Sequence, residues 1–392
     1  MRRHWLSRAA YGGMFVFGIV MALLGAVLPV VSTRLGFELA QAGNLFLAMN
    51  CAMLAAMLAL GPLMDRFGKK PALAGGALLA GLALALIAAA PSYRWLTVAI
   101  ALLGAGGGAL NGATNTLIAD LHEDPREKNS ALNLLGVFFG FGALSIPFVI
   151  GSLLEILGLS AILALASALS LAPTACLALR FPPPKRSEGV PWRETARLAR
   201  DPLVLMFGFL LFFQSGNEFI LGGYTSTYLM REAGASIRSA SYLLAAYWGA
   251  IMLARVVSSR LLLRVSGPTV VLASALGSAA GVALLASART QAMAALAVVL
   301  VGASFASIYP TVLGLAAARF EAWSGTVFGI LFGIALAGGM IMPWAVGQLA
   351  QAHGLRPALL VAAANALAIF ALQMLIARRL TAPCGRGSAT FC

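Results

Sequence analysis

Charged and metal-binding side chains are scarce in this sequence. Only 10% of its 392 residues are charged, against about 25% in soluble globular proteins, and 60% are hydrophobic. The four cysteines and three histidines are widely separated, with Cys51 and Cys176 inside apolar stretches. The sequence therefore predicts no disulfide framework, no metal site and no cofactor.

The patterns of an enzyme or a sensor are also missing. The run Gly106-Gly107-Gly108 has no strand before it and no lysine after it, so it does not read as a phosphate-binding loop. We find no nucleophile–base set in the apolar segments, and the loops are too short for a soluble output domain. We expect neither catalysis nor a purely sensory role.

Apolar segments of about 20 residues, the length that a helix needs to cross a bilayer, recur along the chain. The basic start at Met1–His4 precedes an apolar run longer than that of a signal peptide, so we interpret it as a retained first helix. The prediction is an all-α integral membrane protein with twelve transmembrane helices, at 10–32, 41–63, 71–90, 95–119, 130–154, 159–180, 202–229, 239–258, 268–287, 291–317, 325–349 and 355–378.

The net charge of +14 is divided unequally between alternate loops. With both termini in the cytoplasm, that side receives most basic residues, Arg255 among them, and the outside receives only Arg34, Arg94, Arg231, Arg238, Arg289 and Arg356. This asymmetry is the positive-inside rule. It explains the basic composition without nucleic acid and predicts a monomeric, multi-pass, lipid-embedded protein of a bacterial-type inner membrane.

A polar stretch with several prolines divides the chain into two sets of six spans. We expect a first half at 1–180, a cytoplasmic linker with a short amphipathic helix at 181–201, a second half at 202–380 and a disordered tail at 381–392. An offset of 198 residues aligns glycines of the two halves, including Gly18 with Gly216 and Gly104 with Gly302. This offset indicates a duplication into two pseudo-symmetric halves, each with inverted three-helix repeats.

The seventh apolar segment carries polar groups near its middle. Gln214, Asn217 and Glu218 stand at i, i+3 and i+4, so they share one face of a helix. A charge at the bilayer centre costs about 2.5 to 3.5 kcal/mol, and such residues usually line a cavity or pathway. Glu218 is the only acid that we find near the middle of a span. The sequence is compatible with four roles for Glu218: a local structural contact, hydrogen bonding to a solute, sodium binding or proton transfer.

Further candidates lie on other spans. Asn111 and Asn115 are four residues apart on one face, where their amides serve either helix packing or recognition of solute hydroxyls. Tyr247, Trp248 and Tyr309 offer aromatic rings either to a bound solute or as anchors at the membrane interface. The Tyr309-Pro310 step aligns with Asn111-Gly112 at the repeat offset, which favours a central, hinge-like position.

The loop after the second span reads Gly61-Pro62-Leu63-Met64-Asp65-Arg66-Phe67-Gly68-Lys69-Lys70. This G-x-x-x-D-R-x-G-K-K pattern resembles the signature loop of the major facilitator superfamily. The resemblance implies that Asp65 caps the eleventh span, that Arg66 pairs with Asp120, and that these three residues close the cytoplasmic side in the outward-facing state. The equivalent loop of the second half keeps Arg264 and lacks the aspartate.

The fourth, fifth and seventh spans resemble the fucose-permease-like branch of that family, which includes proton-coupled and sodium-coupled sugar carriers. The chain departs from the proton-coupled members in having Asn111 where they carry a glutamate. The resemblance implies alternating-access transport of a small neutral solute, with a monosaccharide as the first candidate. It also implies coupling to sodium or a proton at Glu218. The alternative is an efflux carrier for amphipathic drugs or lipids. The predicted binding residues are Asn111, Asn115, Gln214, Asn217, Glu218, Tyr247, Trp248 and Tyr309.

Overall fold

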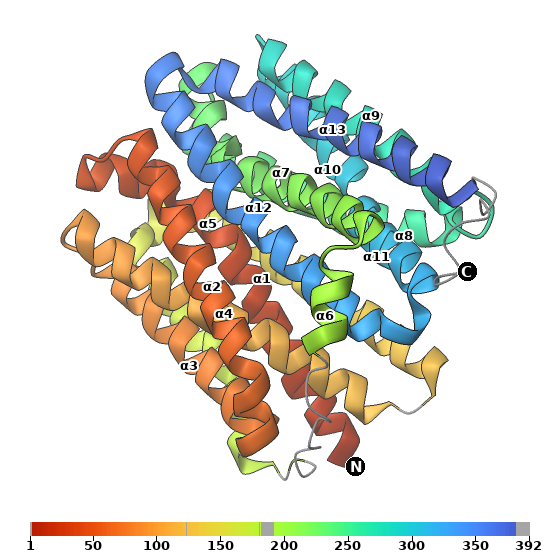
Figure 1. Cartoon of the computed structure of the whole chain (residues 1–392). Helices are drawn as coiled ribbons and strands as arrows, with labels where there is room; N and C mark the ends of the chain where they lie inside the picture. The colour runs from red at the N-terminus through yellow and green to blue at the C-terminus, as the bar shows by residue number, and fades with distance from the viewer. Residues whose placement is uncertain (1, 123, 180, 182–191, 382–392) are drawn as a thin grey trace.

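The computed structural model describes residues 2–122, 124–179, 181 and 192–381, and all regular structure in these ranges is helical (Figure 1). Helix starts are set by local chemistry, since Ser92, Asp201 and Ser236 each accept a hydrogen bond from a backbone N–H of the first turn that follows. The helices are α1 (Arg2–Leu35), α2 (Leu39–Phe67), α3 (Lys69–Ala88), α4 (Tyr93–Leu121), α5 (Pro125–Ser170), η1 (Ala172–Ala178), α6 (Trp192–Leu198), α7 (Pro202–Glu232), α8 (Ile237–Leu261), α9 (Gly267–Ser287), α10 (Gln291–Phe305), α11 (Ile308–Arg319), η2 (Glu321–Trp323), α12 (Ser324–His353) and α13 (Leu355–Thr381).

Eleven segments of the described chain are long and apolar enough to cross a membrane. One of them, Ser130–Ala178, makes two crossings, because the backbone leaves the helix at Gly158 with φ 73° and ψ 162°. Glycine tolerates this positive φ, and Gly354 makes a similar turn between α12 and α13. Beyond Gly158 the chain runs back along α3, with Ser167 Oγ donating to Gly81 O over 2.7 Å. The predicted all-α membrane fold is therefore confirmed.

Close glycine crossings recur in the two halves. In the first, α1 meets α5 so tightly that a Cβ on Gly18 would lie 2.1 Å from a backbone oxygen, and one on Gly142 would lie 1.9 Å from another. In the second, α7 meets α12 at Gly216 and Gly338, and a Cβ on Gly338 would lie 1.9 Å from the oxygen of Phe212. Such contacts let helix backbones approach closely in a membrane.

A second crossing repeats with the predicted offset. Gly104 of α4 lies against the backbone of Met49 in α2, and Gly302 of α10 lies against that of Tyr247 in α8. Both members of the pair are displaced by 198 residues, so the halves share packing contacts as well as residue types. The residue limits of the halves, 1–180 and 202–380, stay predictions.

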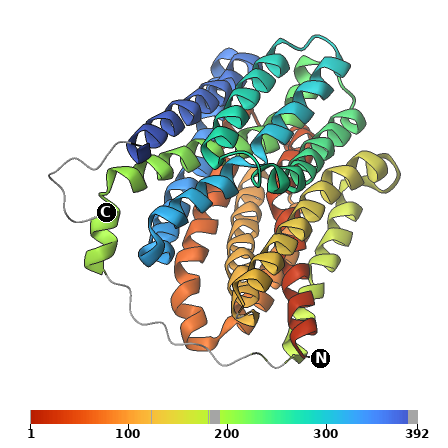
Figure 2. The same ribbon diagram turned by 90° about the vertical axis from the view of Figure 1, so that its right-hand side faces the viewer.

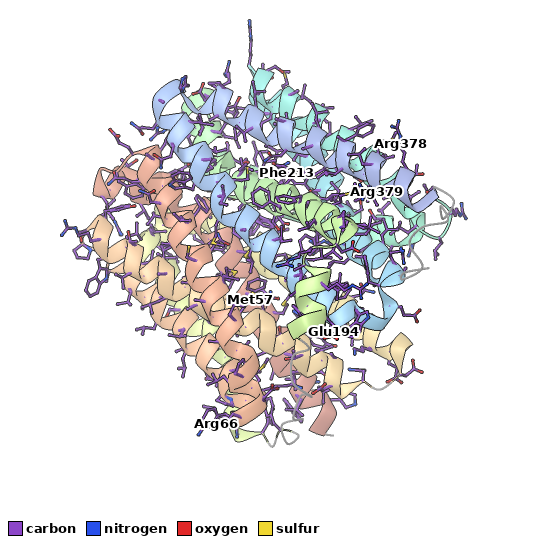
Figure 3. The ribbon with its side chains drawn as sticks, viewed as in Figure 1. Met57, Arg66, Glu194, Phe213, Arg378 and Arg379 are labelled. Atoms are coloured by element: carbon purple, nitrogen blue, oxygen red, sulfur yellow. The ribbon has the colours of Figure 1, made fainter. Side chains whose placement is uncertain are left out.

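Two ends of the molecule differ in their charge. We call the helix ends near Arg66, Arg264 and Arg378 the basic face, and the ends near Arg34 and His353 the outer face. Figure 3 shows Arg66 at the lower end of α2, well apart from Arg378 at the end of α13. The halves therefore part toward the basic face.

At the outer face the halves are joined by hydrogen bonds. Leu39 N donates to Gln351 Oε1 over 3.1 Å, and Trp344 Nε1 donates to Asn44 Oδ1 over 3.1 Å, so α2 is joined to α12. A third contact joins Ser152 of α5 to the Tyr242 hydroxyl of α8. These hydrogen bonds hold the two halves together at the outer face.

The linker is described in part. The short helix expected there is present as α6, before α7. The proline-rich stretch 182–191 and the tail from 382 lie outside the described residues, so the predictions made for them are not addressed by the structure.

Candidate solute site between the two halves

Glu218 lies on α7 and is only partly buried. No described residue forms a hydrogen bond or an ion pair with its carboxylate, so the charged group is available to a ligand or an ion. That this face of α7 serves a pathway stays a prediction. Arg255 of α8 is near enough for its charge to act on this carboxylate.

Arg255 is a candidate site residue that sequence reasoning missed. The sequence analysis counted it among the cytoplasmic charges, but the structure places it within α8, partly buried, with its guanidinium 5.9 Å from the ring centroid of Phe139 in α5. Its Nε is buried without a hydrogen-bond partner. The signal was available, because Arg255 lies inside the predicted span 239–258 and eight residues, about two turns, beyond Tyr247.

Tyr247 and Trp248 form an aromatic wall beside this charge pair. Their rings are 5.3 Å apart in an edge-on arrangement, and the Trp248 ring also contacts Phe139 edge-on at 6.1 Å. Both side chains are at least 98% buried, yet the Tyr247 hydroxyl and the Trp248 Nε1 lack hydrogen-bond partners. The charges of Glu218 and Arg255 both act on Tyr247.

Tyr309 adds an aromatic residue from a broken helix. The predicted span 291–317 is interrupted after Phe305, so α10 and α11 are separate helices, and Tyr309-Pro310 lies just beyond the break. This is the hinge-like position expected from the repeat. The Tyr309 ring stacks on Phe332 of α12 at 6.3 Å, and the charge of Glu218 acts on it.

Two predicted amides are used inside the second half. Gln214 is 1% exposed and donates to Phe305 O, the last carbonyl of α10, over 3.4 Å. Asn217 donates to Ala362 O of α13 and accepts from Asn365 Nδ2, each over 2.9 Å. Sequence reasoning overlooked Asn365, although an amide inside a predicted span was the same signal that singled out Asn217. The candidate solute site around Glu218 therefore does not use Gln214 and Asn217.

Asn111 and Asn115 remain partly exposed on α4. Asn115 Nδ2 donates to the backbone and side-chain oxygens of Asn111, each over 2.9 Å. Asn111 lies on the side of α4 between Gly107, which packs on Val20 of α1, and Gly112, which packs on Leu60 of α2. The pair therefore points between α1 and α2. No described contact joins it to the Glu218 group.

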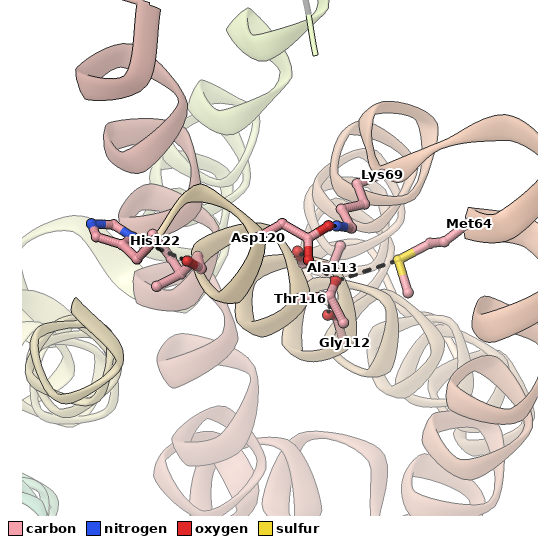
Figure 4. Close-up of polar contacts among 8 residues, drawn as sticks. Met64, Lys69, Gly112, Ala113, Thr116, Asp120 and His122 are labelled. Carbon is pink, nitrogen blue, oxygen red and sulfur yellow. Dashed lines mark hydrogen bonds and ion pairs between the residues drawn. The ribbon is translucent and has the colours of Figure 1, made fainter. Parts of the chain in front are cut away.

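The predicted cytoplasmic gate shows a different pairing. Asp120, at the end of α4, forms its ion pair with Lys69 at the start of α3 (Figure 4). The guanidinium of Arg66 lies over the Phe67 ring, and Asp65 is exposed beside it. Lys69 takes the place expected for Arg66, although α2 and α3 both pack against α4. A gate formed by Asp65, Arg66 and Asp120 stays a prediction for the closed state.

The described residues contain no group of three or more histidine, cysteine, aspartate or glutamate side chains that would hold a metal ion. The chemistry that the site offers is recognition through hydrogen bonds, aromatic faces and two opposite charges.

Two pseudo-symmetric sets of membrane helices, a broken helix and polar groups within the membrane define a polytopic carrier. The chain belongs to the Major Facilitator Superfamily, whose sequence profile matches residues 10–343. This confirms a small-molecule transporter in a multi-pass membrane protein, and not an enzyme.

Known relatives differ in their solutes. The chain is 28% identical over 215 residues to the multi-drug resistance efflux pump PmrA of Streptococcus pneumoniae, and this match spans about half of each protein, 53%. It also resembles the nucleoside transporter NupG, with a TM-score of 0.80, 16% identity and coverage of 96% and 100% of the two chains. The fucose:proton symporter FucP of E. coli gives a TM-score of 0.67 and 21% identity, with coverage of 96% and 99%. At these identities the solved structures support the fold alone.

Proposed function

We propose that the protein is a secondary active transporter of a small neutral polyhydroxylated solute of the monosaccharide class, coupled to a cation at Glu218. The observation that carries this proposal is the set of polar groups without protein partners around Glu218. Unsatisfied buried polar groups are costly, about 1–3 kcal/mol each, so a solute that satisfies them gains affinity.

The chemistry of these groups fits hydroxyls. Arg255 Nε, Trp248 Nε1 and the Tyr247 hydroxyl can donate, while the Glu218 carboxylate accepts. A hydroxyl both donates and accepts, so neighbouring hydroxyls of one solute can bridge the carboxylate and the arginine. The two charges balance, which favours a solute without net charge. The adjacent rings supply an apolar surface for C–H groups.

Glu218 is also the proposed coupling residue. When a proton or sodium ion neutralises the carboxylate, Arg255 is left as the uncompensated charge at the contact between α8 and α5. Arg255 lies on α8 against Phe139 of α5, so it sits where the two halves meet.

A second candidate is drug efflux, favoured by the sequence match to the pump PmrA. An efflux carrier would use the aromatic wall for apolar rings and Glu218 for cationic groups. Arg255 argues for the first candidate, because its positive charge repels a cationic drug.

Transport in proteoliposomes tests the proposal. Uptake of labelled D-glucose and L-fucose is measured with a sodium gradient, a proton gradient or neither, together with ethidium extrusion. We expect one gradient to stimulate uptake of a hexose and Glu218→Gln to abolish the stimulation. Glu155→Gln, the same change at an exposed site, is the matched control.

Three results would count against this assignment. Hexose uptake absent under every gradient, with ethidium extruded, would select the efflux candidate. Uptake that ignores all gradients would make the protein a facilitator. Equal losses in Glu218→Gln and Glu155→Gln would remove the special role of Glu218.

A further inference from the structure

A separate pocket of about 720 Å³ opens near the basic face of the first half. We call it the α1–α5 pocket; it is lined by His4, Ser7, Arg8, Tyr11, His122, Glu127, Ser130, Ala131 and Leu134. Its volume is in the range of about 300–1,000 Å³ that holds drug-sized molecules. None of its residues belongs to the site around Glu218.

The pocket follows from the way in which α1 and α5 cross. The two helices touch backbone to backbone at Gly18 and Gly142, and Figure 2 shows α5 crossing α1 at an angle. Lining residues 4, 8 and 11 continue, at helical spacing, the stripe of α1 that contains Gly18, and residues 127, 131 and 134 continue the stripe of α5 that contains Gly142. The facing stripes separate toward the basic face and enclose the pocket.

Aromatic and apolar groups form the end of the pocket nearest the crossing. The Tyr11 ring stacks on Phe138, with centroids 4.9 Å apart and planes 4° from parallel. Ala131 and Leu134 lie on the adjacent turn of α5. A planar apolar group of a ligand therefore has a flat, prepared surface at this end.

Arg8 and His122 form the other end. Arg8 lies one turn from Tyr11, and its guanidinium is held 4.7 Å from the Trp5 ring centroid. His122 Nδ1 is 3.1 Å from Ile118 O, a contact that fixes the ring and leaves Nε2 for the pocket. Figure 4 shows His122 pointing away from the Lys69–Asp120 pair. Glu127 carries the opposing charge, but it lies in the first turn of α5, where the helix dipole compensates it.

We propose that the α1–α5 pocket binds a small aromatic carboxylate from the cytoplasmic side. The carboxylate pairs with Arg8 and, when both ring nitrogens of His122 carry protons, accepts a hydrogen bond from its Nε2; the ring packs between the Tyr11 stack and Leu134. This is a second ligand site, distinct from the solute site between the halves.

The test is binding of 4-fluorobenzoate to the purified full chain in detergent micelles, followed by fluorine NMR line broadening and displaced by unlabelled benzoate. Arg8→Gln should weaken binding by about tenfold, because a charge-assisted hydrogen bond is lost. Leu134→Asp places a carboxylate on an exposed position of the lining and should weaken it at least as much. Arg94→Gln, an exposed arginine at the outer face, is the matched control and should bind like the wild type.

Two further comparisons show at which site the ligand binds. Glu218→Gln and Arg255→Gln should bind 4-fluorobenzoate with wild-type affinity. If Arg255→Gln loses binding while Arg8→Gln keeps it, the ligand binds at the central site and the proposal is overturned. Neutral 4-fluorobenzyl alcohol should bind at least about tenfold more weakly. Equal binding of acid and alcohol, equal affinity in Arg8→Gln and wild type, or displacement by anionic phospholipid in place of benzoate would also overturn it.

Discussion

Gly25 holds the outer face closed by a contact that tolerates no side chain. It lies on α1 where this helix meets α7 of the other half, and a Cβ added there would be 1.9 Å from the backbone oxygen of Gly222. Cβ atoms essentially never approach closer than 3.0 Å, so Gly25→Ala must part the helices by roughly 1 Å. Because the contact is between backbones, no rotamer change can relieve it.

The expected effect is a shift of conformation. Overpacking of this kind costs about 1–3 kcal/mol, and here the cost falls only on the state in which the outer ends of α1 and α7 touch. That free energy corresponds to a shift of roughly 5- to 150-fold toward the state open at the outer face.

Electron–electron double resonance between spin labels at Arg94 and Arg289, exposed outer positions on the two halves, measures this shift. Gly25→Ala should lengthen the distance between the labels. Gly142→Ala is the matched control, because its Cβ would also lie 1.9 Å from a backbone oxygen, that of Phe15, within the same half. It should lower stability and leave the distance unchanged. An unchanged distance in folded Gly25→Ala, or the same lengthening in both variants, would refute the reasoning.

Three other changes have defined outcomes. Asn217→Ala and Asn365→Ala should each lower the free energy of unfolding by about 0.6 to 1.7 kcal/mol. In a double-mutant cycle, the double variant should lose less than the sum of the two single losses, because both changes remove the same hydrogen bond. Gly158→Ala should lower the melting temperature through a strain of about 1–2 kcal/mol at its positive φ, whereas Gly136→Ala, with no atom within 4 Å, should not. Arg255→Gln should raise the KM for the solute in uptake assays, and an unchanged KM would remove it from the site.

The fold was predictable from the sequence because its signals are repeated. Twelve apolar segments each indicate a span, and glycines at a constant offset indicate two similar halves. The packing of Gly104 on Met49 and of Gly302 on Tyr247 shows why these glycines recur, since each permits a backbone contact that the fold needs twice. The reversal at Gly158 also falls between two predicted spans.

The candidate site was less predictable, because a helical stripe shows which residues share a face but not which neighbour that face meets. Gln214, Asn217 and Glu218 share a stripe of α7, yet the amides bind α10 and α13 while the carboxylate has no partner in the described chain. Arg255 was missed for a related reason: loop-based counting of charge assigns an arginine near a span end to the surface, whereas its long side chain can reach inward.

The break between α10 and α11 connects these observations. A helix that ends inside the membrane leaves carbonyls without partners, and a carbonyl in hydrocarbon must be satisfied by a neighbouring side chain. Gln214 supplies that partner at Phe305, one turn of α7 before Glu218. The amide predicted as a solute ligand thus joins the break between α10 and α11 to the helix that carries the proposed coupling residue. A change of charge at Glu218 and a movement at Tyr309 act on adjacent turns of the same helix, which is a physical route from ion binding to the opening of a half.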